Sequence, residues 1–333
     1  NIANLSDPVG DVIAEWDRPN GLKIQRVRVP LGVIGIIYES RPNVTGDAGS
    51  LCLKSGNAVI LRGGSEATLS NAAIHSCLVH GLLEAGLPET AIQLVPTQDR
   101  EAVGILLRDM AEFIDVIVPR GGKSLISRVQ KDARVPVMGH LEGICHTYVH
   151  ASADLEVARS VVVNAKMRRP GICGATETLL IHKNKSKNVN EILNELTKRG
   201  CSIYADKKIY KLFNGNSKLA NKKTWSKEHL SAKISVKLVD SITDAVNHIN
   251  KYGTMHTDAI VTNNKISAKF FLKNIKSSIA IHNSSTQYAD GGEFGFGGEV
   301  GISTNKLPPR GPVGLNQLVS YKYEIYGSGQ TRK

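Results

Sequence analysis

The chain has 333 residues, enough for two domains or one large α/β unit with a packed core. Its hydrophobic fraction of 41% and charged fraction of 22% are ordinary for a soluble globular protein. No apolar run approaches the roughly 20 residues of a membrane span, and no charged and then apolar leader opens the sequence. We therefore expect a soluble, cytoplasmic protein that does not cross a membrane.

Cysteine spacing and net charge exclude further classes. The five cysteines are widely spaced and form no CxxC pair, which argues against a disulfide framework and against a metal site of the zinc type. The formal net charge is +12, and much of the excess is lysine in the polar stretch 182–237. That stretch lacks interleaved aromatic residues, so a solvated face explains it better than a nucleic-acid groove. A positive field would still steer acidic small molecules.

The first predicted element is a β-hairpin over residues 10–30. The runs 12–16 and 22–29 flank the turn 17–21, and the second run alternates apolar with polar residues. A lone hairpin is marginal in water, so it needs another strand or another subunit as a partner. The strand-like tail 318–325 is a natural candidate.

Short β-rich runs that alternate with helical stretches follow the hairpin. The expected strands are 33–38, 58–61, 92–95 and 114–118, and the clearest helix is 66–85. This alternation predicts a parallel, doubly wound sheet that binds ligands beyond the carboxyl ends of its strands.

Two glycine-rich loops stand at such carboxyl ends. Arg62-Gly63-Gly64-Ser65 and the stretch 119–124 each open a helix, where free N–H groups and a nearby cation suit a phosphate. The second loop imitates the end of a P-loop, but Ile117 stands where the first glycine would be required. A GxGxxG pattern is also absent from the sequence, so a nucleotide cofactor would bind in a non-standard Rossmann manner.

The stretch 162–181 carries the clearest chemical signal. Asp154 should cap a helix that runs to about Lys166, and a Pro-Gly break then leads to Cys173 on a tight loop. Lys166, Arg168 and Arg169 lie within one loop of Cys173 and would favour its thiolate form. A cysteine nucleophile is the leading hypothesis, and an ordinary buried cysteine is the alternative. Later expected elements are helices 188–196 and 243–250, strands 236–239, 259–261 and 279–281, and a glycine-rich loop 290–299 that approaches backbone or ligand closely.

These residues also carry a family resemblance. The sequence around Cys173, with Asn-Ala-Lys and Arg-Pro before it and Glu-Thr-Leu-Leu after it, resembles the aldehyde dehydrogenase superfamily and, within it, the gamma-glutamyl phosphate reductase family. The likeness runs from about Asn4 to Tyr323 and is weakest before Glu228. Further matching blocks are 29–35, 38–44, 56–64, 119–122, 145–149 and 301–304.

The resemblance implies an α/β, aldehyde dehydrogenase-like fold in three parts. Residues 1–30 with 313–333 would form a small β-flap for oligomerisation, residues 31–150 a Rossmann-type NADP-binding domain, and residues 151–312 an α/β catalytic domain. It also implies a homo-oligomer and a functional coupling to glutamate 5-kinase.

It implies a reaction of proline biosynthesis as well. The Cys173 thiolate would attack L-glutamyl 5-phosphate and expel phosphate, and NADPH would reduce the thioacyl enzyme to L-glutamate 5-semialdehyde. The Cys173 N–H would serve as an oxyanion donor, with the Asn43 amide as a second. Asn43 does not align cleanly with the superfamily's oxyanion asparagine, so it could instead cap a turn.

His140 occupies the position of the water-activating glutamate of hydrolytic relatives. An enzyme that exchanges an acyl group with phosphate has no use for that carboxylate, which favours the phosphate-using chemistry over a hydrolytic aldehyde dehydrogenase. His140 could contact phosphate or substrate, or be a structural histidine.

The resemblance assigns further binding residues. Arg62 matches a position suited to a 2′-phosphate; Gly63, Gly64, Arg120, Gly121 and Gly122 would lie near the cofactor phosphates, and Glu228 on the nicotinamide ribose. Lys166, Arg168 and Arg169 are open candidates for the substrate carboxylate. No metal is implied.

Two departures from the family pattern keep other interpretations open. Gly174 stands where the family usually has Asn, which would loosen the Cys173 loop. The chain also opens inside the family's register, as if an N-terminal helical portion were missing and apolar surface of the sheet were exposed. The rival hypotheses are an inactive remnant of the family, a basic binding protein and a hydrolytic aldehyde dehydrogenase.

Overall fold

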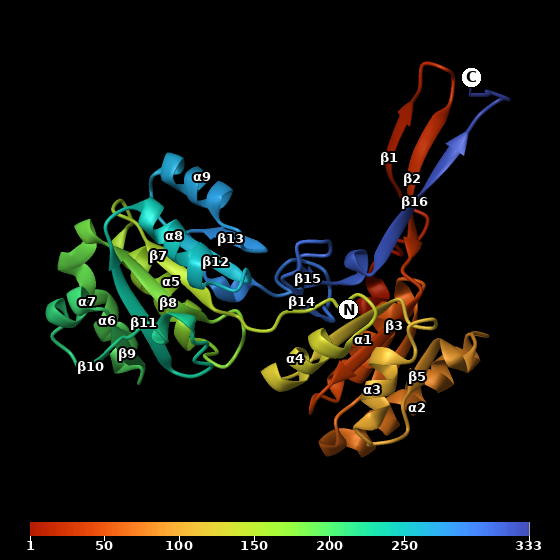
Figure 1. The fold of residues 1–333 in the computed structure, drawn as a ribbon, viewed down its shortest axis with the longest axis horizontal. Coiled ribbons are helices and arrows are strands. Elements are labelled where there is room, and N and C mark those ends of the chain that lie inside the picture. The colour runs from red at the N-terminus through yellow and green to blue at the C-terminus, as the bar shows by residue number, and fades with distance from the viewer. Residues whose placement is uncertain (333) are drawn as a thin grey trace. The chain divides into compact units, whose positions relative to one another are not determined.

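The computed structural model describes residues 1–332 (Figure 1). It divides into two compact units: unit 1 holds residues 1–139 and the chain from Phe294 onward, and unit 2 holds residues 140–293. The divisions therefore fall at 139/140 and 293/294 instead of the predicted 150 and 312. The first prediction placed β7 (Cys145–Val149) on the wrong side, because this strand pairs with strands of unit 2.

Unit 1 contains a parallel four-stranded sheet. The strands are β3 (Val33–Tyr38), β4 (Ala58–Arg62), β5 (Ile92–Leu94) and β6 (Val116–Arg120), in the order β5-β4-β3-β6. Four helices accompany it: α1 (Asn43–Lys54), α2 (Thr68–Glu84), α3 (Glu101–Arg108) and α4 (Lys123–Asp132). The predicted parallel sheet is confirmed.

Alternate side chains of this sheet enter two cores, because successive residues of a strand face opposite sides. Ile36 packs with Leu51 of α1, whereas Ile37 packs with Leu107 of α3. The expectation of an uncovered sheet is wrong for these residues, since Ile36 and Ile37 are buried. Exposed apolar side chains lie on α2 instead, where Leu69 is 87% exposed.

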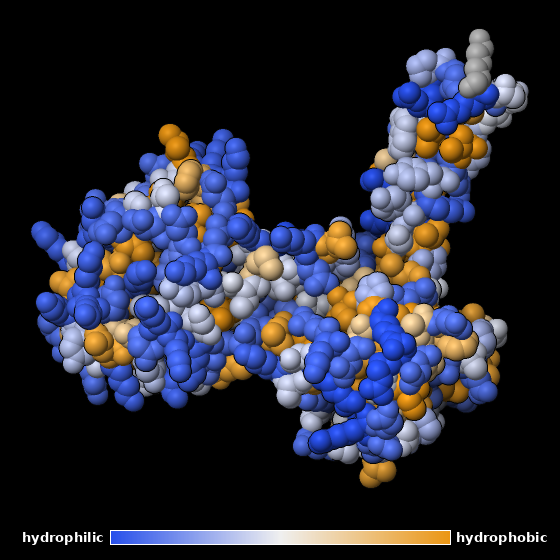
Figure 2. All heavy atoms as spheres, in the orientation of Figure 1, coloured by the Kyte–Doolittle hydropathy of each residue, from blue (hydrophilic) through white to orange (hydrophobic). Residues whose placement is uncertain are grey.

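An antiparallel three-stranded sheet extends from unit 1. Its order is β1 (Val12–Asp17), β2 (Lys23–Pro30) and β16 (Val319–Tyr326), which confirms the predicted hairpin and its pairing with the tail. β14 (Gly301–Ser303) and β15 (Gly311–Val313) form a separate antiparallel pair. Apolar side chains are exposed on the three-stranded sheet (Figure 2), among them Val12, Trp16, Tyr323 and Ile325.

Unit 2 contains a parallel seven-stranded sheet in the order β10-β9-β11-β8-β7-β12-β13. Leu179 and Leu180 face opposite cores, and helices cover both sides of the sheet (Figure 1). One core includes residues of α5 (Leu155–Met167), α6 (Val189–Lys198) and α7 (Lys207–Leu212); the other includes residues of α8 (Ile242–Tyr252) and α9 (Lys265–Asn274). The remaining strands are β8 (Thr176–His182), β9 (Ser202–Ala205), β10 (Ser217–Leu219), β11 (Lys233–Val239), β12 (Thr257–Val261) and β13 (Ile279–His282).

Helix α5 leads to the cysteine loop. Its N-cap is Asp154, which accepts a hydrogen bond from the Val157 N–H at 3.0 Å, as predicted. Short 3₁₀ turns connect other elements: η1 Ile2–Asn4, η2 Ser65–Ala67, η3 Glu89–Ala91, η4 Lys183–Asn188, η5 Thr224–Ser226, η6 Thr286–Tyr288 and η7 Leu315–Gln317. Among residues 1–332, no helix combines the length and the apolar character needed to span a membrane.

Candidate active site

The chemically active residues of unit 2 gather at the amino-terminal edge of its sheet. Four neighbouring strands, β11, β8, β7 and β12, are each preceded by one of them: Glu228, Cys173, His140 and His256 in that order. The expectation of ligands beyond the carboxyl ends of the strands was made for the sheet of unit 1, and the residues of unit 2 gather at the opposite, amino-terminal edge of their own sheet. Parallel strands bring their amino ends to one edge, so residues far apart in sequence meet there.

Cys173 lies with two histidines. The ligand-type atoms of His140, Cys173 and His256 are all within 4.8 Å of one another, and the two imidazole rings meet edge to face with 4.8 Å between centroids. His256 is fully buried. Its Nδ1 lies 2.9 Å from the Thr257 hydroxyl oxygen, whereas its Nε2 is buried without a hydrogen-bond partner among the described residues. We name these three residues the Cys-His cluster.

Two neighbours, Cys145 and Gly143, lie against the backbone carbonyl of Cys173. The Cys145 thiol donates a hydrogen bond to the Cys173 carbonyl at 3.1 Å. Burial raises the pKa of the Cys145 thiol well above its usual value, so this sulfur stays protonated. A Cβ on Gly143 would stand 2.2 Å from the same carbonyl oxygen, so only glycine fits at this position.

Cys173 itself is half-buried, unlike the fully buried Cys52 and Cys145, so the alternative of an ordinary buried cysteine is wrong. Its backbone N–H has no acceptor within residues 1–332, which suits the predicted oxyanion donor. Gly174 is buried against Thr286, whose carbonyl oxygen would be 3.2 Å from an added Cβ. The loop is therefore packed tightly where the missing asparagine predicted a looser one.

Glu228 reaches the site through a backbone contact. Its Oε1 accepts a hydrogen bond from the Gly143 N–H at 2.7 Å. The next two residues are fixed by Glu177, whose carboxylate accepts from the N–H groups of His229 at 3.0 Å and Leu230 at 3.3 Å. The proposed ribose ligand thus lies beside the nucleophile loop, and its role stays a prediction.

Lys166 forms a buried ion pair. Its Nζ lies 3.1 Å from Glu177 Oε2, and both side chains are fully buried. Burial raises the pKa of the Glu177 carboxyl to about 7, and the Lys166 charge opposes that shift. A buried, paired ammonium is a poor ligand for a free substrate, so the structure argues against Lys166 as the carboxylate-binding cation. Its pairing also removes it from the cations expected to favour the thiolate.

Arg168 and Arg169 remain exposed, and Arg168 lines two cavities. The smaller, of about 80 Å³, is lined by Asn164, Arg168, Gln287, Tyr288 and Glu293. Arg168 Nη1 donates to Gln287 Oε1 at 3.4 Å. Because Gly174 packs against the same 286–289 segment, this cavity lies beside the cysteine loop.

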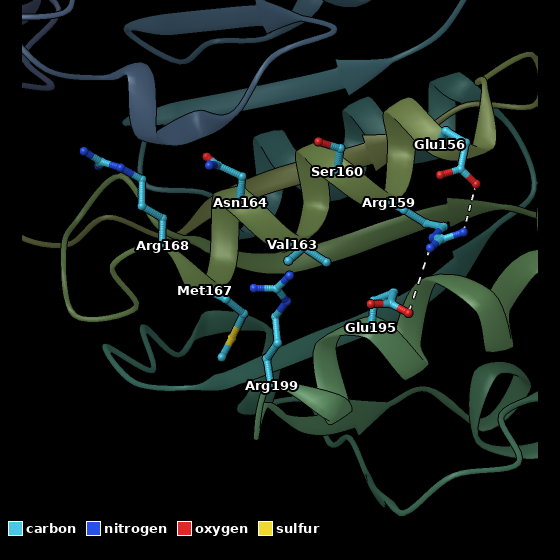
Figure 3. A pocket seen from close by; sticks show the side chains of 9 residues that line it. All are labelled: Glu156, Arg159, Ser160, Val163, Asn164, Met167, Arg168, Glu195 and Arg199. Atoms are coloured by element: carbon cyan, nitrogen blue, oxygen red, sulfur yellow. Dashed lines mark hydrogen bonds and ion pairs between the residues drawn. The ribbon is translucent and has the colours of Figure 1, made fainter.

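The larger cavity, of about 400 Å³, follows the outer face of α5 toward α6 (Figure 3). Arg159 crosses it and pairs with Glu156 at 2.8 Å and with Glu195 at 3.9 Å. The other cations on its walls are Arg168 and Arg199. The positive charge at the Arg159 end of this cavity is therefore partly neutralised by the two glutamates. The other end, at Arg168, adjoins the smaller cavity.

The predicted cofactor residues lie in unit 1. Arg62 is only 8% exposed, and its guanidinium donates to the carbonyls of Gly63, Gln98 and Asp99. Burial and the like charges of Arg100 and Arg128 lower its pKa. Arg62 thus anchors a loop within an arginine cluster, and the exposed member of that cluster is Arg100.

The second glycine loop begins α4 as expected, with Gly122 as N-cap. Its Gly122 N–H already donates to Glu39 Oε2 at 2.6 Å, and a Cβ on Gly121 would stand 2.6 Å from the same oxygen. A phosphate at this loop must therefore displace a carboxylate. Gly63 is required for packing, because a Cβ there would be 2.2 Å from the Asn71 amide. Arg120 is half-buried at the end of β6, and its Nε has no partner in the described chain.

Asn43 is the first residue of α1 in unit 1, and its amide donates to Asp47 at 3.0 Å. The contact joins two side chains and caps no backbone group, so the turn-capping role and the role at the thiol both stay predictions. Sequence reasoning missed His256, Gly143, Glu39 and Arg100. The signal available for His256 was its position three residues before the predicted strand 259–261, comparable with those of Cys173 and His140 before their own strands.

Comparisons with known proteins agree on one group. The aldehyde dehydrogenase family profile matches residues 5–203. A gamma-glutamyl phosphate reductase from Allorhizobium ampelinum is 58% identical over 332 residues, 99% of this chain and 78% of the relative. The solved gamma-glutamyl phosphate reductase from Thermotoga maritima superimposes with a TM-score of 0.97 at 43% identity, over 100% of this chain and 80% of that one. An acetylating aldehyde dehydrogenase from Geobacillus thermoglucosidasius shares the fold, with a TM-score of 0.72 at 16% identity over 97% of this chain and 81% of that one.

Proposed function

Because this chain belongs to the gamma-glutamyl phosphate reductase family, within the aldehyde dehydrogenase family, we propose that it reduces L-glutamyl 5-phosphate to L-glutamate 5-semialdehyde in proline biosynthesis. The observation that carries this proposal is the Cys-His cluster at the amino edge of the unit 2 sheet. A half-buried thiol beside two imidazoles, on a residue whose backbone N–H has no acceptor among residues 1–332, is equipped for acyl transfer.

The first step is formation of a thioester. An imidazole of His140 or His256 accepts the Cys173 proton, and the sulfur lone pair forms a bond to the acyl carbon. The carbon–oxygen bond to phosphate breaks, and phosphate leaves with the electron pair. The Cys173 N–H stabilises the oxyanion of the tetrahedral intermediate.

A nicotinamide cofactor, when bound, would supply the hydride that reduces the thioester carbon. The imidazole that took the thiol proton can return a proton to the resulting hemithioacetal oxygen. When the carbonyl re-forms, the same imidazole takes the hydroxyl proton back, the carbon–sulfur bond breaks with its electron pair on sulfur, and Cys173 is released as a thiolate beside the imidazolium. The chain's own contribution is to position the acyl group, hold the proton and stabilise the oxyanion.

Arg168 is the best candidate for the substrate carboxylate. The substrate's amino-acid head carries one carboxylate and one ammonium, and the small cavity beside the cysteine loop offers Arg168 and Glu293. A guanidinium recognises a carboxylate through paired hydrogen bonds. Arg169 is exposed but does not line this cavity.

The residues of unit 1 fit a nicotinamide cofactor that carries a 2′-phosphate. Burial, and then the like charges of Arg100 and Arg128, lower the pKa of Arg62, while Asp99 opposes the shift and Arg128 lies 3.6 Å from Asp132. Three neighbouring guanidinium groups still concentrate positive charge that a dianion would favour. We assign NADPH on this ground, with Arg100 as the contacting cation and Arg62 as its support. Exchange of Arg100 for Gln would then lower turnover with NADPH and leave turnover with NADH unchanged. The exchange Arg108→Gln, at a guanidinium paired with Glu101 at 2.7 Å, is the matched control.

A hydrolytic aldehyde dehydrogenase fits the site less well. The titratable groups that lie with the thiol are imidazoles, and the nearby Glu228 carboxylate accepts a hydrogen bond from the Gly143 N–H. Without a carboxylate base to activate water, the thioester would be cleaved by phosphate and not by hydrolysis.

We also propose that the chain acts as a homo-oligomer in the cytoplasm. The three-stranded sheet exposes Trp16 and Ile325, and its outer strands β1 and β16 each leave one edge unpaired among the described residues. Direct coupling to glutamate 5-kinase, which would protect the labile acyl phosphate, is a further expectation of the same pathway. All five cysteines are free, which fits a reducing compartment.

Phosphate-dependent reduction of NADP⁺ with glutamate-5-semialdehyde tests the proposal. Turnover should require phosphate and vanish in Cys173→Ala, whereas Cys77→Ala, at an exposed cysteine, should match the parent. Turnover without phosphate would favour the hydrolytic alternative. Absence of turnover from folded protein would favour an inactive member of the family.

A further inference from the structure

The Cys-His cluster has the composition of a transition-metal site. Two imidazole nitrogens and one thiolate form a borderline-soft ligand set of the kind that binds Zn²⁺. Zinc prefers about 2.0–2.1 Å to nitrogen and about 2.3 Å to sulfur, which places tetrahedral ligands roughly 3.5 Å apart. The three ligand atoms lie within 4.8 Å of one another. Side-chain rotations of the half-buried His140 and Cys173 that move these atoms by about an ångström would bring them to the spacing that zinc requires.

A second observation points to a ligand of the same histidine. His256 Nε2 is buried without a hydrogen-bond partner among residues 1–332, whereas its Nδ1 lies beside the hydroxyl of Thr257. A buried, unpaired ring nitrogen is costly and therefore calls for a partner. The Thr257 contact also fixes the imidazole orientation, as an outer-shell contact does in metal sites.

The neighbouring thiol takes no part in the ligand set. Cys145 is fully buried, and its thiol already donates to the Cys173 carbonyl at 3.1 Å. The cluster thus offers three ligands and leaves a fourth position to solvent, which is the pattern of an exchangeable site rather than a structural one.

We propose that the Cys-His cluster binds Zn²⁺ reversibly, with His140, Cys173 and His256 as ligands and water as the fourth. The bound metal holds the sulfur lone pair that would attack the acyl carbon, so it inhibits the enzyme. The binding does not depend on the proposed function, whereas the inhibition does.

Titration of the full chain with Co²⁺ tests the binding without any assay of activity. The proposal predicts one equivalent of Co²⁺, a thiolate-to-cobalt charge-transfer band and displacement of the cobalt by Zn²⁺. Cys173→Ser should abolish the band. His256→Ala should weaken Zn²⁺ binding more than about 100-fold, because loss of a direct ligand costs more than the roughly 10- to 100-fold loss seen when only an outer-shell partner is removed. Circular dichroism of both variants shows whether they remain folded.

Two control variants separate this site from adventitious binding. Cys77→Ser and His80→Ala remove an exposed thiol and an exposed imidazole and should leave the titration unchanged. Loss of the band in Cys77→Ser, or an unchanged band in Cys173→Ser, would overturn the proposal. If the protein binds one Co²⁺ at Cys173 but lacks reductase activity, the metal site stands and the proposed function fails. If the protein shows reductase turnover and Zn²⁺ neither binds nor inhibits, the proposed function stands and the metal site fails.

Discussion

Gly143 lies directly against the carbonyl of Cys173, and a Cβ at Gly143 would stand 2.2 Å from that oxygen and 2.8 Å from the Cys173 Cα. The same glycine donates its N–H to Glu228. One small residue therefore links the nucleophile loop to the acidic residue before β11. The position of the sulfur depends on this contact.

The exchange Gly143→Ala should push the Cys173 loop out of place. Since a misplacement of about 1 Å can cost about 100-fold in rate, we expect kcat to fall by one to two orders of magnitude, roughly, while the protein stays folded. Gly171→Ala is the matched control, because an added Cβ there meets its nearest atom at 3.7 Å. Steady-state kinetics of both variants decide the matter; equal activity of the two would contradict the geometry.

Removal of the Arg168 guanidinium should weaken substrate binding. A hydrogen bond to a charged group is worth about 1.5–3 kcal/mol, so Arg168→Ala should lower kcat/KM for the semialdehyde by about 10- to 100-fold, mostly through KM. Arg199→Ala alters only the larger cavity and should have little effect. A larger loss in Arg199→Ala than in Arg168→Ala would move the carboxylate site to the α5–α6 cleft.

The buried pair Lys166–Glu177 should matter for stability. Lys166→Met leaves the Glu177 carboxylate buried without its cation, which should cost about 3–5 kcal/mol in the free energy of unfolding. Lys198 pairs with Glu195 at 3.0 Å on the surface, and Lys198→Met should cost less than about 1 kcal/mol. Urea denaturation at pH 8 measures both, and similar losses would refute the structural role of the buried pair.

Stability should also depend on pH through His248. Burial, with the nearby His146 and Lys237, lowers the pKa of His248 to about 2, so it stays neutral in the folded chain. In the unfolded chain the histidine has a pKa near 6.5, so below that pH it binds a proton that the folded chain does not bind. The contribution of His248 to the free energy of unfolding is therefore complete above about pH 6.5 and is lost as the pH falls toward 2.

The variant His248→Gln should consequently show a shallower decline of unfolding free energy between pH 6.5 and 4, by up to about 1.4 kcal/mol per pH unit. Gln can still accept the hydrogen bond that Lys237 forms with His248 Nδ1 at 3.1 Å. His80→Gln, at an exposed site, serves as the reference. Parallel pH profiles of the variant and the parent chain would show that His248 is not the titrating group.

The sequence predicted the fold well because its strands and caps are local. The continuous apolar runs 33–38 and 58–61 and the helix cap at Asp154 can be recognised without long-range information. The structure confirms each of them. The boundary at residue 150 was missed because β7 looks like any other buried strand. Its membership depends on pairing with β8 and β12, which follow it in the chain.

The site was predicted only in part. Cys173 stood out through its loop, whereas the signal for His256 was only its place before a predicted strand, and it joins the thiol through the order of β8, β7 and β12. Lys166 was misjudged because lysine is rarely buried without a partner. Its partner, Glu177, lies on the next strand and also fixes the loop before β11.

The most direct test of the account is the mass of the intact protein after incubation with glutamate-5-semialdehyde and NADP⁺ in the absence of phosphate. Hydride leaves the hemithioacetal under these conditions, and phosphate is not there to release the acyl group. The account predicts one glutamyl adduct per chain, located on the Cys173 peptide and lost when phosphate is added. An adduct on another cysteine, or NADPH formation in Cys173→Ser at the parent rate, would contradict it.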